Sequence, residues 1–408
     1  MDKKEAYIVR ELAKEYAEVA ALPVQEEKKS LWRKLNAKKP ERPMVAIDSI
    51  CWNELNVNDE LTLRCDNPDV RKWEDFFRKT LYQWRRFPCD MVVNNYLTVT
   101  KAAHGVRFEL PTEEDTIITD PQNDVYSHAY KNQIRTMEDL EKVKTPTVWH
   151  DEAETARQLN LAKELFDGII EVRVNGVTPY MSVWDPIATW MGMENVYIAL
   201  IDNPDMMHEL VNRMVAGYMS IHSQMEELGL LEHTQPLIQR TGAWTDDLPA
   251  EGFDPCKPRL RDIWGFGLAQ TLSLCSPAMF DEYEIEPNLK LFERFGLMFY
   301  GCCEPLDGKM ASVRKIPNVR KVSMSPWTNK ARGAAEIGRD YVFSNRPNPG
   351  FLVAFDEDVI RKDMMETKKI CESEGCPLEF IIRDIGTVNY EPQRIWRCEQ
   401  IAMEVAGA

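Results

Sequence analysis

The stretch Gly296-Leu-Met-Phe-Tyr-Gly-Cys-Cys-Glu-Pro-Leu-Asp-Gly308 joins a short apolar run to thiol and carboxylate side chains. The apolar run predicts a buried β-strand, and the proline after the glutamate predicts a turn. Side chains alternate between the faces of a strand, so Tyr300, Cys302 and Glu304 are expected on one face and Cys303 on the other, unless the strand has already ended. The stretch therefore predicts a strand that carries metal ligands to its C-terminal end, with two buried structural cysteines as the alternative.

Apolar runs of this kind recur along the chain, and each is followed by a loop and a helix-like segment. Eight such alternations of buried strand and helix predict a parallel (β/α)8 TIM barrel. A doubly wound open sheet is the alternative, although no GxGxxG segment follows any of the runs. The predicted strands are residues 43–50, 90–99, 169–176, 236–242, 296–302, 319–326, 341–346 and 378–385.

The first 42 residues predict a helical N-terminal extension. Ile8, Leu12 and Tyr16 recur at helix spacing, and a second helix is expected to end before Pro40. Residues 43–408 then form the predicted barrel, in which the first four strands are separated by longer insertions than the last four. No Gly/Ser-rich linker divides these 408 residues, so a clean two-domain split is not expected.

Charge and composition exclude several classes of function. The formal charge of −16 argues against sequence-independent binding to nucleic acid or to an anionic membrane, because both require basic surfaces. The opening MDKKEAYIVRELAKEY is a charged amphipathic helix and not a signal peptide, and no apolar run reaches the roughly 20 residues that span a bilayer. A cytoplasmic protein is expected, whose ten cysteines stay reduced and free to bind metal.

Polar and aromatic residues cluster at the C-terminal ends of the predicted strands, where a barrel places its active site. Each of them alone is ordinarily a loop residue, but their joint placement predicts a substrate site. Arg240 follows the fourth strand, and Arg383 and Asp384 end the eighth. The expected substrate-binding residues, some of which form an aromatic wall, are Trp52, Glu54, Asn94, Tyr96, Trp184, Trp327 and Asn345.

Several segments resemble the uroporphyrinogen decarboxylase superfamily, which contains tetrapyrrole decarboxylases and zinc-dependent corrinoid methyltransferases. The segment Trp264-Gly-Phe-Gly-Leu-Ala-Gln270 is similar to the family's sequence before the fifth strand, and Ser344-Asn-Arg-Pro-Asn-Pro349 resembles its Gly-Asn-x-Asp-Pro. The N-terminal segment from Leu31 through Glu54 looks like a longer-chain branch found in anaerobic bacteria. The resemblance implies a barrel fold, in agreement with the strand count.

The resemblance also implies an altered zinc site. The methyltransferases hold zinc with the His and Cys of a His-x-Cys motif and with a Cys on the last strand. Here Tyr300 stands at the His position, Cys302 matches the Cys, Cys303 follows it, and Asp384 lies near the last-strand position. The implied metal ligands are therefore Cys302, Cys303 and Asp384, with Glu304 as a further carboxylate.

The function implied is a zinc-dependent methyltransferase that moves a methyl group between a small O-, N- or S-methyl compound and a corrinoid. Tyr300 and Glu304 would take part in catalysis, while Arg240 and Arg383 would bind a substrate carboxylate. A separate carrier protein would hold the corrinoid, because the chain lacks an Asp-x-His-x-x-Gly segment. The expectation leaves room for a homodimer.

Two alternatives remain open at this stage. One is a decarboxylase or other lyase, although residues 49–55 (SICWNEL) lack the arginines that follow the first strand in that branch. The other is a non-catalytic protein that binds a tetrapyrrole or corrinoid.

Overall fold

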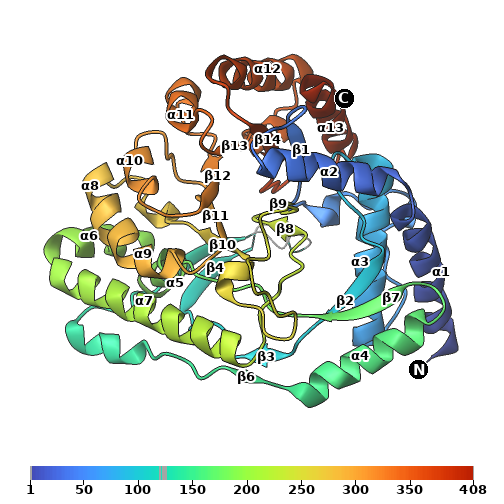
Figure 1. The fold of residues 1–408 in the computed structure, drawn as a ribbon, viewed down its shortest axis with the longest axis horizontal. Helices are drawn as coiled ribbons and strands as arrows, with labels where there is room; N and C mark the ends of the chain where they lie inside the picture. Colours follow the sequence, from blue (N-terminus) through green and yellow to red (C-terminus); the bar gives the residue numbers. More distant parts are fainter. Residues whose placement is uncertain (1, 119–120, 122–125, 408) are drawn as a thin grey trace.

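The computed structural model describes residues 2–118, 121 and 126–407, and two parallel sheets lie at its centre (Figure 1). The larger sheet has six strands in the order β1-β14-β13-β12-β11-β10, and the smaller pairs β2 with β7. The larger sheet comprises β1 (Met44–Ile47), β14 (Leu378–Ile382), β13 (Val342–Asn345), β12 (Val319–Met324), β11 (Leu297–Tyr300) and β10 (Trp264–Gly267), and the smaller comprises β2 (Tyr96–Thr100) and β7 (Glu171–Asn175).

A parallel α/β architecture is therefore confirmed. Within the described residues, the ladder hydrogen bonds do not join the two sheets into one ring. Closure into an eight-stranded barrel stays a prediction, as do the domain limits 1–42 and 43–408, whose outermost residues Met1 and Ala408 lie outside the described part of the chain.

The prediction of a fourth parallel strand at residues 236–242 is wrong. These residues form an antiparallel hairpin of β8 (Leu237–Ile238) and β9 (Thr241–Gly242), while β10 pairs with β11 in the parallel sheet. Two glycines give β10 a weak strand signal, and packing requires them. A Cβ at Gly265 would lie 2.5 Å from the Met298 sulfur of the neighbouring strand β11 and 2.5 Å from the Phe295 ring, and one at Gly267 would lie 3.0 Å from Phe292.

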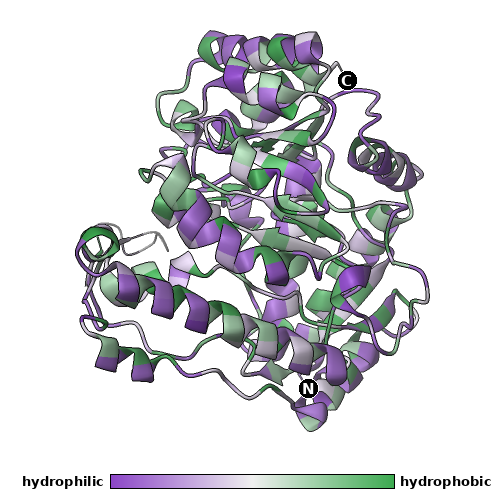
Figure 2. Ribbon diagram, turned by 60° about the vertical axis from the view of Figure 1, so that its left-hand side comes forward, coloured by the Kyte–Doolittle hydropathy of each residue, from purple (hydrophilic) through white to green (hydrophobic). Residues whose placement is uncertain are grey.

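Helices surround the two sheets, as Figure 1 shows. Figure 2 shows that the outer helices carry hydrophilic residues, while hydrophobic residues gather along the strands. None of the described helices combines the length and apolarity needed to cross a bilayer. The helices are α1 (Lys3–Ala20), α2 (Val24–Asn36), α3 (Pro68–Arg86), α4 (Glu152–Phe166), α5 (Trp184–Met191), α6 (Met193–Asp202), α7 (Pro204–Glu227), α8 (Pro277–Phe280), α9 (Glu286–Phe292), α10 (Met310–Val313), α11 (Lys330–Ile337), α12 (Glu357–Glu374) and α13 (Gln393–Ala406).

The two N-terminal helices pack against the rest of the molecule. Tyr16 of α1 makes an edge-to-face contact with Phe77 of α3, with ring centroids 5.4 Å apart. Trp32 of α2 is buried in a cluster with Met44 and Val342, the first residues of β1 and β13. The helix α2 therefore covers the N-terminal ends of these strands and leaves their C-terminal ends free of it.

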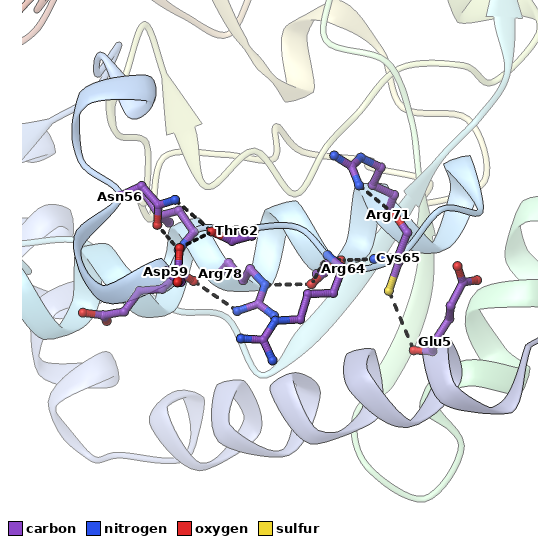
Figure 3. Close-up of polar contacts among 11 residues, drawn as sticks. Glu5, Asn56, Asp59, Thr62, Arg64, Cys65, Arg71 and Arg78 are labelled. Atoms are coloured by element: carbon purple, nitrogen blue, oxygen red, sulfur yellow. Dashed lines mark hydrogen bonds and ion pairs between the residues drawn. The ribbon is translucent and has the colours of Figure 1, made fainter. Parts of the chain in front are cut away.

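Hydrogen bonds fix the connection from β1 to α3 (Figure 3). Asn56 Nδ2 donates to Thr62 Oγ1 at 2.9 Å, and Arg71 Nη1 donates to the Cys65 carbonyl at 2.8 Å. The Cys65 thiol lies 3.9 Å from the carbonyl oxygen of Glu5 in α1. These contacts tie the segment that follows the first strand to the N-terminal helix.

A buried ion pair crosses the interior of the larger sheet. Lys321 of β12 and Glu379 of β14 have fully buried side chains, with Nζ and Oε2 2.8 Å apart. Lys321 Nζ also contacts Thr241 Oγ1 at 3.3 Å and the Gly242 carbonyl at 3.1 Å. Glu379 accepts from the hydroxyls of Thr241 and Ser344 as well. Every charged group in this network has partners, as a buried ion pair requires.

Candidate functional site

Cys302 lies in a buried polar cluster just after β11. Its Sγ is 3.1 Å from Arg346 Nη1, 3.6 Å from Cys303 Sγ and 3.6 Å from Gln239 Nε2. The strand ends at Tyr300, and Gly301 adopts φ +96°, a conformation that favours glycine. The alternation of strand faces therefore stops before the cysteines, and both sulfurs approach the same guanidinium group.

The surroundings of Cys302 favour its thiolate. A hydrogen bond from Cys303 and the positive charge of Arg346 lower the pKa of Cys302 below its usual value, although burial opposes the shift. The same interaction raises the pKa of Cys303, which keeps its proton. Within this pair the thiolate form is therefore favoured at Cys302, beside the arginine.

Arg346 retains free hydrogen-bond donors. The residue is 3% exposed, and within the described chain its Nε and Nη2 atoms have no hydrogen-bond partner. Arg383 Nη1, at the end of the neighbouring strand β14, is likewise buried without a partner among the described residues. Buried donors are nearly always satisfied in folded proteins, so these atoms point to a ligand that carries acceptor oxygens.

Tyr300 and Glu304 do not face the sulfur of Cys302. Tyr300 is fully buried between Phe280 and Phe292, and its hydroxyl donates to Glu284 Oε1 at 2.9 Å. Burial raises the pKa of Glu284 to about 8, so this carboxyl group is protonated at neutral pH. Glu304 is also fully buried, and its two oxygens accept from the backbone amides of Cys302 and Ala269, each at 2.9 Å. Glu304 thus fixes the turn that carries Cys302.

The donor set does not fit the zinc site that the family resemblance implies. Asp384 adopts φ +59° and pairs with its neighbour Arg383 at 3.0 Å, with 44% of its side chain exposed. Across residues 2–118, 121 and 126–407, no three His, Cys, Asp or Glu side chains converge as metal ligands do. Four donors are usual for zinc, and the positively charged Arg346 guanidinium lies 3.1 Å from Cys302 Sγ, where it competes with a cation for the sulfur.

A cavity of about 590 Å³ lies along β1, β2 and β7, and its described lining includes neither Cys302 nor the residues that contact the Cys302 sulfur. Arg240 lines it with Nε 3.4 Å from Asp48 Oδ1. Gln239 and Arg240 form the two-residue turn of the β8–β9 hairpin, with φ of +46° and +74°, a geometry that normally selects Asn and Gly. This turn presents Gln239 to Cys302 and Arg240 to the cavity, so it connects the two.

The other predicted substrate residues are dispersed. Asn94 and Tyr96 line the cavity, whereas Trp184 is fully buried under the helical layer and Trp327 is 72% exposed. Asn345 is buried at the end of β13, and its Oδ1 has no hydrogen-bond partner within the described chain.

Trp52 and Glu54 have structural contacts and do not face an open site. Trp52 is half-buried against Tyr82, with ring centroids 6.3 Å apart. Glu54 is buried and accepts from the amides of Val388 and Tyr390, at 2.8 and 3.0 Å. Glu54 thereby fixes the loop that follows the last strand.

Arg346 and Gln239 were not among the predicted site residues. Arg346 is the last residue of the predicted strand 341–346, next to Asn345, so its position carried a signal. The burial of Arg346 and its lack of partners could not be predicted, because both depend on neighbours from β11 and β14. Gln239 was hidden by the prediction of a continuous strand across residues 236–242.

The comparisons with known proteins show a likeness of fold. No family model matches the chain, and no curated protein matches it in sequence. In structure it is similar to a methyltransferase from Methanosarcina mazei, with a TM-score of 0.51 and 11% identity over 92% of this chain and 98% of that one. The two share an overall fold. At this identity, membership in the uroporphyrinogen decarboxylase superfamily stays a prediction.

Proposed function

We propose that this chain is a methyltransferase that moves a methyl group between a small methylated compound and a corrinoid held by a separate carrier protein. The observation that carries the proposal is the buried Arg346 guanidinium, which lies against the Cys302 sulfur and has two nitrogen atoms without a partner among the described residues. It lies at the C-terminal ends of parallel strands, where sites of such folds are found. The fold likeness to a methyltransferase supports the proposal by association only.

The difficult part of methyl transfer is the departure of the heteroatom that loses the methyl group. This atom keeps the bonding electron pair and develops negative charge. Arg346 Nε and Nη2 can donate hydrogen bonds to it, and in a buried site preorganised donors stabilise such charge strongly. Cys302 accepts from Nη1 of the same group and so fixes the plane of the guanidinium, which makes it a positioning residue.

Zinc plays no part in this mechanism, because the described donors do not fit it. The zinc that the family resemblance implies stays a prediction that metal analysis of anaerobically purified protein checks. Against the resemblance, the mechanism proposed here predicts less than one zinc per chain, because the described side chains do not converge as zinc ligands do. A stoichiometric zinc that is lost in Cys302→Ala would instead restore the resemblance-based site.

The proposed reaction is tested anaerobically with free cob(I)alamin as the methyl acceptor and a panel of O-, N- and S-methyl compounds. Loss of the cob(I)alamin absorption is expected with at least one compound. The rate should fall in Arg346→Gln and stay unchanged in Arg332→Gln, whose side chain is 60% exposed and paired with Asp307. A panel that leaves the spectrum unchanged, or equal rates for the wild type and Arg346→Gln, would contradict the proposal.

A further inference from the structure

We infer that Cys302 and Cys303 form a redox-active dithiol, which a peroxide oxidises reversibly to a disulfide between the two neighbours. This inference does not rest on methyl transfer and adds a modification site to the chain. The two Sγ atoms lie 3.6 Å apart. Consecutive side chains of a strand point to opposite faces, so adjacent thiols do not meet within one. Their convergence is therefore a property of the turn that follows β11.

Main-chain contacts hold the two thiols in this arrangement. The strand β11 ends at Tyr300, and Gly301 turns the chain with φ +96°. The amide of Cys302 donates to Glu304 Oε2 at 2.9 Å, and its carbonyl accepts from Ser323 Oγ at 2.8 Å. Both polar groups of the Cys302 backbone are thus paired, so the turn keeps the two sulfurs in contact before any reaction.

The side chain of Arg346 favours reaction at Cys302. Its Nη1 atom lies 3.1 Å from Cys302 Sγ and 3.9 Å from Cys303 Sγ. A thiolate is the nucleophile in thiol chemistry, and a positive neighbour stabilises it. Cys302 is 6% exposed and Cys303 is half-buried. A small oxidant such as hydrogen peroxide therefore reaches these sulfurs more easily than a bulky one.

The oxidation balances with hydrogen peroxide as the electron acceptor. Cys302 Sγ attacks one peroxide oxygen and the O–O bond breaks, which gives a sulfenic acid and a hydroxide that takes up the proton released by Cys302. Cys303 Sγ then attacks Cys302 Sγ and loses its proton, and the S–O bond breaks with release of water. In total the two thiols lose two electrons and two protons, and the peroxide is reduced to two molecules of water.

A disulfide between adjacent residues is strained. Consecutive Cα atoms lie about 3.8 Å apart across a trans peptide, below the roughly 4.4–6.8 Å that disulfides usually span. Strain makes a disulfide easier to reduce, and labile disulfides are typical of reversible modification. Oxidation also removes the thiolate beside Arg346, so the guanidinium loses its charged partner at this site.

Peptide mass spectrometry tests this site directly. Trypsin releases both cysteines in one peptide, residues 295–309, which holds no other cysteine. The reduced full-length chain is treated with equimolar hydrogen peroxide, its remaining thiols are alkylated, and it is digested. This peptide is expected to lose two hydrogen atoms and both alkylation sites. Dithiothreitol added before alkylation should restore them.

Two variants separate the roles of the sulfurs. Cys303→Ser should stop at a sulfenic acid on Cys302, which dimedone traps, and Cys302→Ser should give neither product. The matched control Cys256→Ser, at an exposed cysteine, should leave the oxidation of peptide 295–309 unchanged. Urea unfolding of each variant shows whether it is folded.

Three outcomes overturn the inference. One is that peptide 295–309 of the wild type keeps two alkylatable thiols after the peroxide treatment. Another is that folded Cys303→Ser gives no dimedone adduct at Cys302, and the third is an oxidation that dithiothreitol does not reverse. The cob(I)alamin assay is a separate measurement on reduced protein, so the dithiol and the proposed methyl transfer can each fail alone.

Discussion

Two buried charge pairs in this molecule differ in how completely their hydrogen-bonding groups are paired. Lys321 and Glu379 lie within strands β12 and β14, and neighbouring hydroxyl and carbonyl groups satisfy them. Arg346 and Cys302 lie just beyond the C-terminal ends of β13 and β11, and two guanidinium nitrogens have no partner within the described chain. A saturated pair serves the fold, whereas a pair with free donors is available to a ligand.

The largest effect is expected where the saturated pair is broken. Glu379→Gln leaves the Lys321 ammonium buried without its counter-charge, and removing one member of a buried pair costs about 3–5 kcal/mol of unfolding free energy. Urea unfolding measures this. The matched control is Glu404→Gln, which breaks an exposed pair with Arg361 and should cost less than about 1 kcal/mol. Equal costs for the two variants would show that the Lys321 pair is not special.

Arg346→Gln should lower activity strongly and stability only slightly. Loss of a preorganised donor typically lowers kcat about 100- to 1,000-fold, and this is the expected loss in methyl transfer. The unfolding free energy should change less than in Glu379→Gln, because Cys302 can take up a proton when the guanidinium is lost and two nitrogen atoms of Arg346 have no partner among the described residues. A stability loss as large as that of Glu379→Gln, with activity retained, would erase the distinction between the two pairs.

Tyr300→Phe separates packing from chemistry on the strand that precedes Cys302. Its hydroxyl donates to the buried Glu284, so the substitution should cost about 1–3 kcal/mol in urea unfolding. The methyl transfer rate should stay unchanged, because Tyr300 faces Phe280 and Phe292 and not the Cys302 sulfur. A large loss of rate in a stably folded variant would restore the catalytic role of Tyr300 that the family resemblance implies.

The smallest effect concerns the titration of Cys302. Its pKa is lowered in the folded chain, so the stability it contributes is present above the unfolded pKa and is lost as the pH falls through the folded value. Alkylation by iodoacetamide, located by peptide mass spectrometry, should therefore continue below the usual pH range of thiols. The alkylation profile should move to higher pH in Arg346→Gln. Identical profiles would mean that Arg346 does not hold the thiolate.

Much of the architecture could be predicted because a buried strand is visible as a run of apolar residues in its own segment of the sequence. Leu297 to Phe299 and the corresponding runs of β12, β13 and β14 are apolar enough to be recognised without their neighbours. The strand β10 was not predicted, because close packing requires glycine at positions 265 and 267 and glycine contributes no apolar side chain to the pattern. Residues 236–242 gave the opposite error: a parallel strand was predicted there, but the apolar residues belong to an antiparallel hairpin.

The candidate site was predictable in place but not in arrangement. Cys302, Cys303 and Arg383 lie at the C-terminal ends of predicted strands, and the ends of parallel strands were expected to meet. Whether Cys302 faces a carboxylate or an arginine depends on the turn at Gly301 and on which groups donate hydrogen bonds to the oxygens of Glu304. Both depend on atoms far away in the chain, such as the amide of Ala269.

The sequence by itself determined the parallel α/β architecture and the location of reactive side chains at strand ends, because apolar periodicity and composition are local properties. The tertiary structure alone decided that Cys302 pairs with Arg346, that Asp384 pairs with Arg383, and that nitrogen atoms of both arginines have no partner in the described part of the chain. Hydrogen bonding in a buried site is settled by the three-dimensional competition among all nearby groups, and no segment contains that competition within itself.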